Sequence, residues 1–257
     1  MPERPYWDET QMQADHVMPA VLAIGDSWFW YPIGQSLLDP INTKIWNKQY
    51  CIYAIGANGA EVRDYVEGKY RNIVRDALKG YGAGLSAVFI SGGGNDFAGW
   101  TDLRPLLKSN CTGANSAVDC FDANSMQQLF SSLKRYYVSL IMQIQEKCPA
   151  NVKIVLHNYD YAIPSGKGLI GDQRWLKTPM VDRKVPDALM SPCMRYLVDS
   201  FTDSIESLAS DDPNILVVKS AGCLAESEWA NELHPTPSGF GKIAEQRWSP
   251  VLKQILP

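Results

Sequence analysis

The stretch AVLAIGDSWFWYP (residues 20–32) contains the pattern from which the fold of this chain can be predicted. It opens with an apolar run that ends at Gly25, as a buried strand does, and Asp26 and Ser27 follow directly. Polar residues that follow a buried strand lie at the carboxyl edge of a parallel sheet, where such sheets bind ligands. A turn at this edge can expose a serine hydroxyl beside a helix N-terminus. The stretch therefore predicts a strand that presents Ser27 at a candidate site.

Short runs of the same kind recur along the chain and alternate with amphipathic stretches. The predicted strands are AVLAIG (20–25), YCIYAIG (50–56), LSAVFISG (85–92), VKIVLH (152–157) and ILVV (215–218). Helical spacing of apolar residues predicts helices over 61–80, 126–148 and 187–210, and a terminal helix from about Pro237 to Leu252. This alternation is typical of an α/β fold with a central parallel sheet of about five strands flanked by helices.

The length and composition favour one domain. The chain has 257 residues, of which 46% are hydrophobic, and shows no internal repeat or linker. We expect a single domain over 1–257, in which 1–19 form an N-terminal extension. Two long polar stretches, 97–124 and 158–185, follow predicted strands, and we expect these loop insertions to lie over the active site.

Charge and hydropathy exclude several classes of partner. The formal net charge is −4 and no basic run occurs, so nucleic acid is not an expected partner. No apolar run reaches the roughly 18 residues of a membrane span. The polar N-terminus lacks the pattern of a signal peptide, which favours a soluble cytoplasmic protein. The oligomeric state is not predictable from these features.

The cysteines leave the compartment open. There are six, and Cys111 and Cys120 flank a polar loop that a disulfide could close. A disulfide there would indicate an oxidising compartment and an exported protein, whereas reduced thiols fit the cytoplasm equally well. No cluster of His, Asp and Cys has metal-ligand spacing, so we expect neither a metal nor a cofactor.

Four short motifs carry the residue types of nucleophilic catalysis. Ser27 in GDS is a candidate nucleophile, and His234 in NELHPTP is a candidate base, because a serine hydroxyl is a weak nucleophile until an imidazole takes its proton. Asn95 in GGGND and the backbone N–H of Gly59 in IGANGAEV, or of Gly56 as the alternative, are candidate donors to an oxyanion. Each motif alone is also compatible with an ordinary turn or helix cap.

Together, in this order along the chain, the four motifs resemble the blocks of the SGNH/GDSL hydrolase superfamily. The resemblance implies a three-layer, flavodoxin-like α/β fold and a serine esterase. It implies Ser27 as nucleophile, His234 as general base, and an oxyanion hole formed by the Ser27 backbone, Gly59 and Asn95. The implied substrate is an acyl or acetyl ester of a small molecule, lipid or sugar. The alternatives are an acyltransferase of the same fold and a catalytically impaired binding protein.

One position departs from that superfamily. Its last block usually has aspartate three residues before the histidine, and this chain has Asn231 there. An asparagine can accept a hydrogen bond from the imidazole but supplies no negative charge. We expect Asn231 to orient His234, with Glu228, Glu232 or a backbone carbonyl as alternatives.

Aromatic residues gather around the motifs. Trp28, Phe29, Trp30 and Tyr31 follow the serine, and Phe97 and Trp100 follow the asparagine. Such rings either line a pocket or pack in the core. We expect substrate contacts from Trp28, Trp100, His157 and Tyr159; for His157 a purely structural role is the alternative.

Overall fold

The computed structural model describes residues 5–31, 34–169 and 175–256, and its centre is a five-stranded sheet. All neighbouring strands are parallel, and their order is β2-β1-β3-β4-β5, as in flavodoxin-like folds. The predicted strands and the α/β class are confirmed. The strands are β1 (Val21–Gly25), β2 (Ile52–Gly56), β3 (Ala87–Ser91), β4 (Lys153–His157) and β5 (Ile215–Val218).

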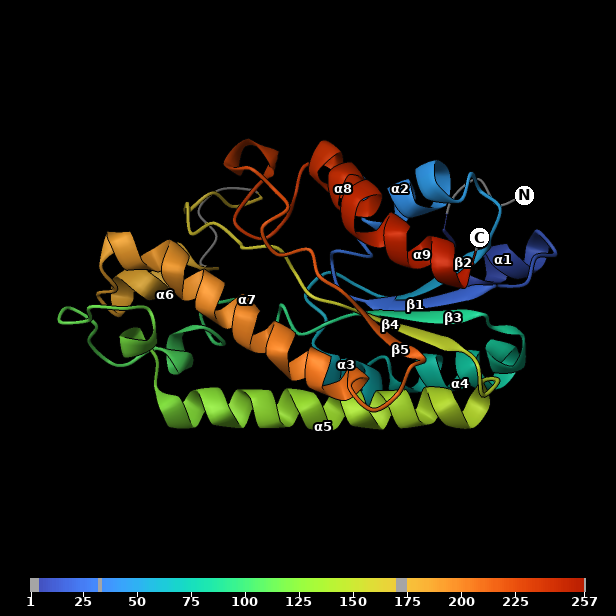
Figure 1. Cartoon of the computed structure of the whole chain (residues 1–257), viewed down its shortest axis with the longest axis horizontal. Coiled ribbons are helices and arrows are strands. Elements are labelled where there is room, and N and C mark those ends of the chain that lie inside the picture. The colour runs from blue at the N-terminus through green and yellow to red at the C-terminus, as the bar shows by residue number, and fades with distance from the viewer. Residues whose placement is uncertain (1–4, 32–33, 170–174, 257) are drawn as a thin grey trace.

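Helices cover both faces of the sheet and make three layers (Figure 1). Every residue of β1 and β3 is buried, as expected for central strands covered on both faces. One face carries α3 (Val62–Val66), α4 (Arg71–Tyr81), α5 (Ala123–Lys147) and α7 (Asp187–Ala209). The other carries α2 (Leu38–Pro40), α8 (Pro237–Ile243) and α9 (Ser249–Ile255).

The two longest helices match the predicted ranges 126–148 and 187–210. Helix α5 begins after Asp122, whose carboxylate accepts a hydrogen bond from the backbone N–H of Ser125 at 2.8 Å. Helix α7 contains Pro192 in its second turn. Both bury an apolar stripe that includes Tyr137 on α5 and Phe201 on α7, so their position follows from their amphipathic pattern.

The prediction of one continuous helix over 61–80 was wrong. The chain forms α3 and α4 instead, with residues 67–70 between them. A Cβ at Gly68 would lie 2.6 Å from a carboxylate oxygen of Asp64, so the chain folds back on α3 at a point where only glycine fits. The apolar spacing continues across this turn, which is why the pattern alone suggested a single helix.

The terminal helix is also interrupted. The Thr236 hydroxyl accepts from the backbone N–H of Gly239 and caps α8, a wider π-helical turn follows over Ala244–Trp248, and α9 continues to Ile255, beyond the expected end at Leu252. Pro250, at the second position of α9, has no N–H to donate to the preceding turn, and π turns absorb such a change of register.

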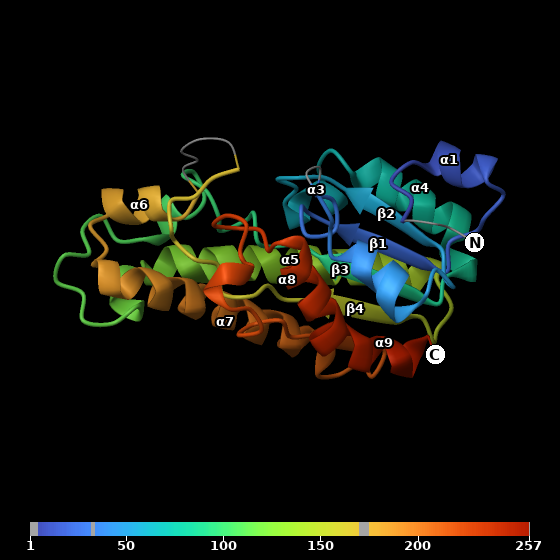
Figure 2. The same ribbon diagram turned by 90° about the horizontal axis from the view of Figure 1, so that it is seen from above.

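The predicted insertions lie at one end of the sheet. In Figures 1 and 2, the segment that precedes α5, together with α6 (Lys177–Asp182), lies beyond the carboxyl ends of the strands. The first halves of α5 and α7 extend to the same side. Residues 170–174 of the second insertion lie outside the described residues. The N-terminal extension contains α1 (Glu9–Ala14), and Tyr6 bridges to Tyr53 at the edge of the sheet.

The cysteines and the helices bear on the questions of compartment and membrane. All six cysteines are free thiols, and Cys111 Sγ lies 3.5 Å from the carbonyl oxygen of Cys120. The structure therefore does not contain the disulfide that was one of the two alternatives. In the described part of the chain, no helix combines the length and apolar character needed to span a bilayer.

Candidate active site

A tight turn after β1 places Ser27. The Asp26 backbone N–H donates to the Ser91 carbonyl on β3, and the Asp26 carboxylate accepts from the backbone N–H of Trp28 at 3.0 Å. This carboxylate-to-backbone bond closes the turn locally. Ser27 is 5% exposed, so the turn holds its hydroxyl inside a recess rather than on open surface.

His234 reaches this turn from the loop between β5 and α8. Its Nε2 lies 2.8 Å from Ser27 Oγ across 207 residues of sequence. A hydrogen bond joins this loop to the turn that contains Ser27, because the indole Nε1–H of Trp28 donates to the Leu233 carbonyl at 3.1 Å. The structure thus joins the first and last motifs at hydrogen-bonding distance.

Asn231 contacts the other side of the imidazole. Its Oδ1 lies 3.0 Å from His234 Nδ1 and accepts from the backbone N–H groups of Leu233 and His234 at 3.0 and 2.9 Å. Two backbone donors face this atom, so it must be the amide oxygen and not the nitrogen. Nδ1 therefore carries a proton, and Nε2 of the neutral ring presents its lone pair to the Ser27 hydroxyl.

The two glutamates that were alternatives to Asn231 are bonded elsewhere. The Glu232 carboxylate is fully buried and accepts from the backbone N–H groups of Gly166, Leu176 and Lys177. The Glu228 carboxylate pairs with Lys242 Nζ at 2.7 Å. Glu232 therefore holds the second loop insertion in place, and Glu228 makes a surface contact. Of the three side chains, Asn231 is the one that contacts the imidazole.

Burial sets the protonation of the site. It lowers the pKa of His234 to about 4, so the imidazole is neutral at neutral pH. Burial also raises the pKa of Asp26 to about 6, against the hydrogen bonds from Tyr159 and Trp28, which favour its charged form. The Tyr159 hydroxyl donates to Asp26 Oδ2 at 2.6 Å. A neutral imidazole next to a serine is the state that a general base needs.

Two of the predicted oxyanion donors are unused. In the described structure, the backbone N–H groups of Ser27 and Gly59 donate no hydrogen bond. Gly59 is exposed in the turn after β2, with φ +76°. Gly56 serves packing instead, because a Cβ there would lie 1.8 Å from the Gly25 carbonyl oxygen. The role of Gly59 as an oxyanion donor stays a prediction.

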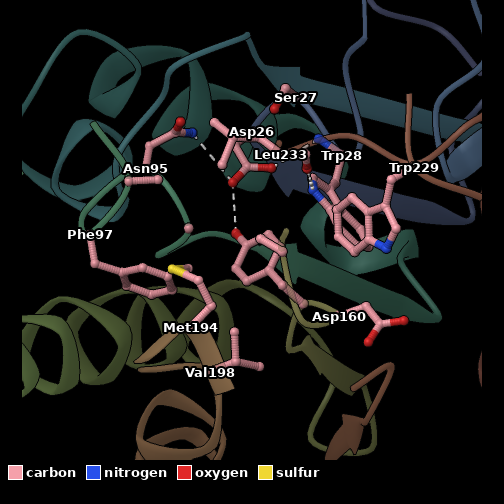
Figure 3. A pocket seen from close by; sticks show the side chains of 14 residues that line it. Asp26, Ser27, Trp28, Asn95, Phe97, Asp160, Met194, Val198, Trp229 and Leu233 are labelled. Carbon is pink, nitrogen blue, oxygen red and sulfur yellow. Dashed lines mark hydrogen bonds between the residues drawn. The ribbon is translucent and has the colours of Figure 1, made fainter. Parts of the chain in front are cut away.

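The third donor, Asn95, is already engaged. Its Nδ2 donates to the Ala60 carbonyl at 3.0 Å. It also donates to Asp26 Oδ2 at 3.4 Å (Figure 3). The first bond joins Asn95 to the turn that contains Gly59. The second bond is long, so donation to a substrate oxygen requires the exchange of only this weak contact.

An apolar pocket opens beside Ser27 (Figure 3). It holds about 430 Å³ of space when the open solvent at its mouth is included. Figure 3 shows Phe97, Met194 and Val198 together along one part of the wall. The lining comprises Asp26, Ser27, Trp28, Gly94, Asn95, Phe97, Ala98, Tyr159, Asp160, Ala162, Met194, Val198, Trp229 and Leu233.

Two of the four expected substrate contacts line this pocket and two do not. Trp28 and Tyr159 belong to the wall. Trp100 is not part of it; the Arg104 guanidinium lies over its ring at 5.1 Å. His157 is fully buried, with its ring nitrogens 3.2 and 2.8 Å from the hydroxyls of Ser91 and Ser220. The structure corrects the expected substrate contact of His157, whose role is structural.

Sequence reasoning missed several residues of the site. Met194 and Val198 come from α7, where they read as part of a helical core stripe. Tyr31 and Trp175 contact the ring of His234. Only the aromatic run after Ser27 hinted at Tyr31, because contacts between distant segments leave no local pattern. In the described ranges, no group of three or more His, Cys, Asp or Glu side chains is arranged to hold a metal.

Comparison with known proteins supports the fold. No family model and no curated protein sequence matches the chain. A lipase from a goat rumen metagenome matches with 13% identity and a TM-score of 0.57, over 89% of this chain and 95% of that one. A GDSL-like lipase from Parabacteroides merdae matches with 17% identity and a TM-score of 0.50, over 89% and 94%.

A third solved structure is a salicylyl-acyltransferase from a tetracycline biosynthetic pathway. It matches with 14% identity and a TM-score of 0.52, over 94% of this chain and 56% of that one. At such identities the likeness is one of fold, and fold alone does not establish a reaction. The chain has the flavodoxin-like α/β fold of the SGNH/GDSL hydrolases.

Proposed function

We propose that this protein is a serine hydrolase that cleaves a carboxylic ester through an acyl-enzyme on Ser27. The observation that carries the proposal is the arrangement of Ser27, His234 and Asn231. Ser27 Oγ lies 2.8 Å from the unprotonated Nε2 of a buried imidazole, and Asn231 Oδ1 holds its Nδ1–H at 3.0 Å. A nucleophile, a base and an orienting group at these distances form a catalytic triad.

The chemistry follows from this geometry. Ser27 Oγ attacks the ester carbonyl carbon while Nε2 of His234 takes the hydroxyl proton. The carbonyl oxygen becomes an oxyanion, which the N–H groups of Ser27 and Gly59 and the amide of Asn95 stabilise. Collapse breaks the bond to the alcohol, which leaves with the proton from His234. A water molecule, deprotonated by His234, then releases the acid and restores Ser27.

The pocket indicates the kind of acyl group. The pocket is largely apolar, and in Figure 3 Phe97, Met194 and Val198 line the part of it that lies beyond Asp26 from Ser27. Apolar surface removed from water stabilises a bound alkyl or aryl group by roughly 25 cal/mol per Å². We infer that the acyl chain occupies this pocket and that the alcohol part, whether small molecule, lipid or sugar, lies toward the mouth.

The test compares hydrolysis of p-nitrophenyl acetate, butyrate and octanoate by the wild type and by Ser27→Ala prepared side by side. We expect turnover that disappears in the variant, and butyrate or octanoate preferred over acetate. Labelling by a fluorophosphonate at one equivalent, absent in Ser27→Ala, would show an activated serine independently of the ester. If the wild type shows no turnover and no labelling, the binding-protein alternative is favoured.

Acyl transfer to another alcohol is a second candidate. It is supported by the low exposure of Ser27, at 5%, because a nucleophile shielded from water preserves an acyl-enzyme for another acceptor. The similar fold of an acyltransferase is consistent with it. Product analysis with and without glycerol or a sugar as acceptor separates the two reactions, since transfer yields a new ester and hydrolysis yields free acid.

A further inference from the structure

The imidazole of His234 contacts two aromatic side chains. The ring of Tyr31 stacks on it, with centroids 4.5 Å apart and planes inclined by 28°. Trp175 meets it edge to face, with centroids 5.9 Å apart. In addition, the amide nitrogen of Asn231 donates to the Tyr31 hydroxyl at 3.4 Å. Tyr31 therefore contacts both members of the pair that would activate Ser27.

This arrangement matters because, within 5–31, 34–169 and 175–256, the acceptor at the imidazole Nδ1 is the neutral amide of Asn231 and not a carboxylate. When His234 takes the proton of Ser27 it becomes positively charged, and Asn231 is neutral. The nearby carboxylates face other partners. Glu232 accepts three backbone N–H groups, Glu228 pairs with Lys242, and Asp26 accepts from Tyr159 and Trp28. A neutral group that contacts the ring can also stabilise its charged form.

The face of an aromatic ring can do this. Its π electrons attract a cation within about 6 Å of the centroid, by roughly 0.5–1 kcal/mol at exposed sites and more where water is excluded. Tyr31 satisfies the distance, and His234 is 2% exposed. Tyr31 follows Ser27 by four positions, so the turn that presents the nucleophile also carries this ring to the imidazole.

We propose that Tyr31 is a positioning residue whose ring face stabilises the protonated form of His234 and whose hydroxyl holds the Asn231 amide in place. Its importance for turnover rests on the proposed function, whereas its effect on the imidazole does not. Tyr31 thus supplies part of the stabilisation that an aspartate at position 231 would give.

The test measures the pKa of His234 by NMR of its ring protons, without any substrate. The sequence has three histidines, and burial lowers the pKa of His157 to about 3, so the signals are few and separable. We expect Tyr31→Leu, which keeps an apolar cover, to lower the His234 pKa by roughly 0.5–1 unit. Tyr31→Phe and Tyr31→Trp both keep an aromatic ring face, so they should change the His234 pKa little.

A His234 pKa that does not fall in Tyr31→Leu would contradict the proposal. If Tyr31 only shields His234 from water, Tyr31→Leu leaves the pKa unchanged or raises it, and the proposal is overturned. Tyr136→Leu, which removes a tyrosine from α5 that stacks on Arg135, is the matched control and should not move it. Far-UV circular dichroism establishes that each variant is folded, and Tyr31→Met, which also lacks a ring, replaces Tyr31→Leu if that variant is not folded.

Kinetics give a second readout. For whichever ester the wild type cleaves, we expect Tyr31→Leu to lower kcat about three- to tenfold, with KM nearly unchanged. Tyr31→Phe should lower kcat less, because it removes only the hydrogen bond to the Asn231 amide. A change confined to KM would mean that Tyr31 merely contacts substrate. If the wild type cleaves no ester, the proposed function fails, and the NMR titration still decides the effect of Tyr31 on His234.

Discussion

Asn231 and His234 are joined twice, since the Asn231 amide oxygen lies 2.9 Å from the backbone nitrogen of His234 and 3.0 Å from its ring Nδ1. The backbone contact fixes which end of the amide faces the ring, and the ring contact fixes the tautomer. An asparagine can therefore orient this imidazole as an aspartate would. What it cannot supply is charge, and the effect of that difference can be measured.

Asn231→Asp should shift the pH profile. The general base must be neutral, and burial lowers the pKa of His234 to about 4, so wild-type kcat/KM should hold at mildly acidic pH and fall only as the ring is protonated. A carboxylate at 231 favours the charged ring and raises this pKa by roughly 1–3 units. We expect the acid limb of kcat/KM to move to higher pH by that amount. An unmoved limb would mean that His234 is not the titrating base.

Asn231→Leu should remove the orientation without adding charge. Nδ1 then loses its acceptor, and the ring can rotate or adopt the other tautomer, as in triads that lose their third member. We expect kcat/KM to fall by roughly 10²–10⁴ with the fold retained. Steady-state kinetics checks this, and Asn124→Ala at an exposed position of α5 is the control. Wild-type activity in Asn231→Leu would contradict the assigned role.

Asn95→Ala should act on the chemical step. If its amide stabilises the oxyanion, its loss lowers kcat by roughly 10²–10³ and leaves KM within a few-fold. The same substitution removes the 3.0 Å bond to the Ala60 carbonyl, so urea unfolding of the variant is measured beside its kinetics. A lower kcat in a variant as stable as the wild type would indicate donation to the oxyanion, whereas loss of stability with kcat unchanged would indicate a structural role.

Val198→Trp should change the preferred acyl chain. Val198 lines the pocket from α7, and an indole there fills space that the acyl group would occupy. We expect hydrolysis of the octanoyl ester to fall relative to the acetyl ester by at least tenfold. The control is Val138→Trp on the solvent side of α5, where the valine is 38% exposed. An unchanged ratio in Val198→Trp would place the acyl group elsewhere.

His157→Gln should make the free energy of unfolding fall less steeply as the pH is lowered. Burial lowers the pKa of His157 to about 3, whereas the unfolded chain has about 6.5, so the unfolded state binds the extra proton between these values. The stability that neutral His157 contributes is present above about pH 6.5 and is lost as pH falls toward 3. Urea unfolding should show the wild type losing roughly 1.4 kcal/mol per pH unit relative to the variant. Parallel pH dependences would contradict this.

The sequence was sufficient for the strands and most of the helices, because each is specified by its own residues. The five apolar runs became the five strands, since a strand that ends in glycine and polar residues shows its pattern locally. The break at Gly68 was not predictable from the sequence, because the clash that a Cβ would make with Asp64 depends on how the chain folds back. The same holds for the π turn in the terminal helix.

For the candidate site, the sequence by itself determined the residue types, their order along the chain and their place at the ends of strands. Only the tertiary structure decided which of them meet. It placed His234 against Ser27 across 207 residues, turned Glu232 to the backbone of a loop, and stacked Tyr31 on the imidazole. It also buried His157 between two serines. The physical reason is that helical and strand periodicity are local properties, whereas a contact between distant segments depends on the packing of the whole chain.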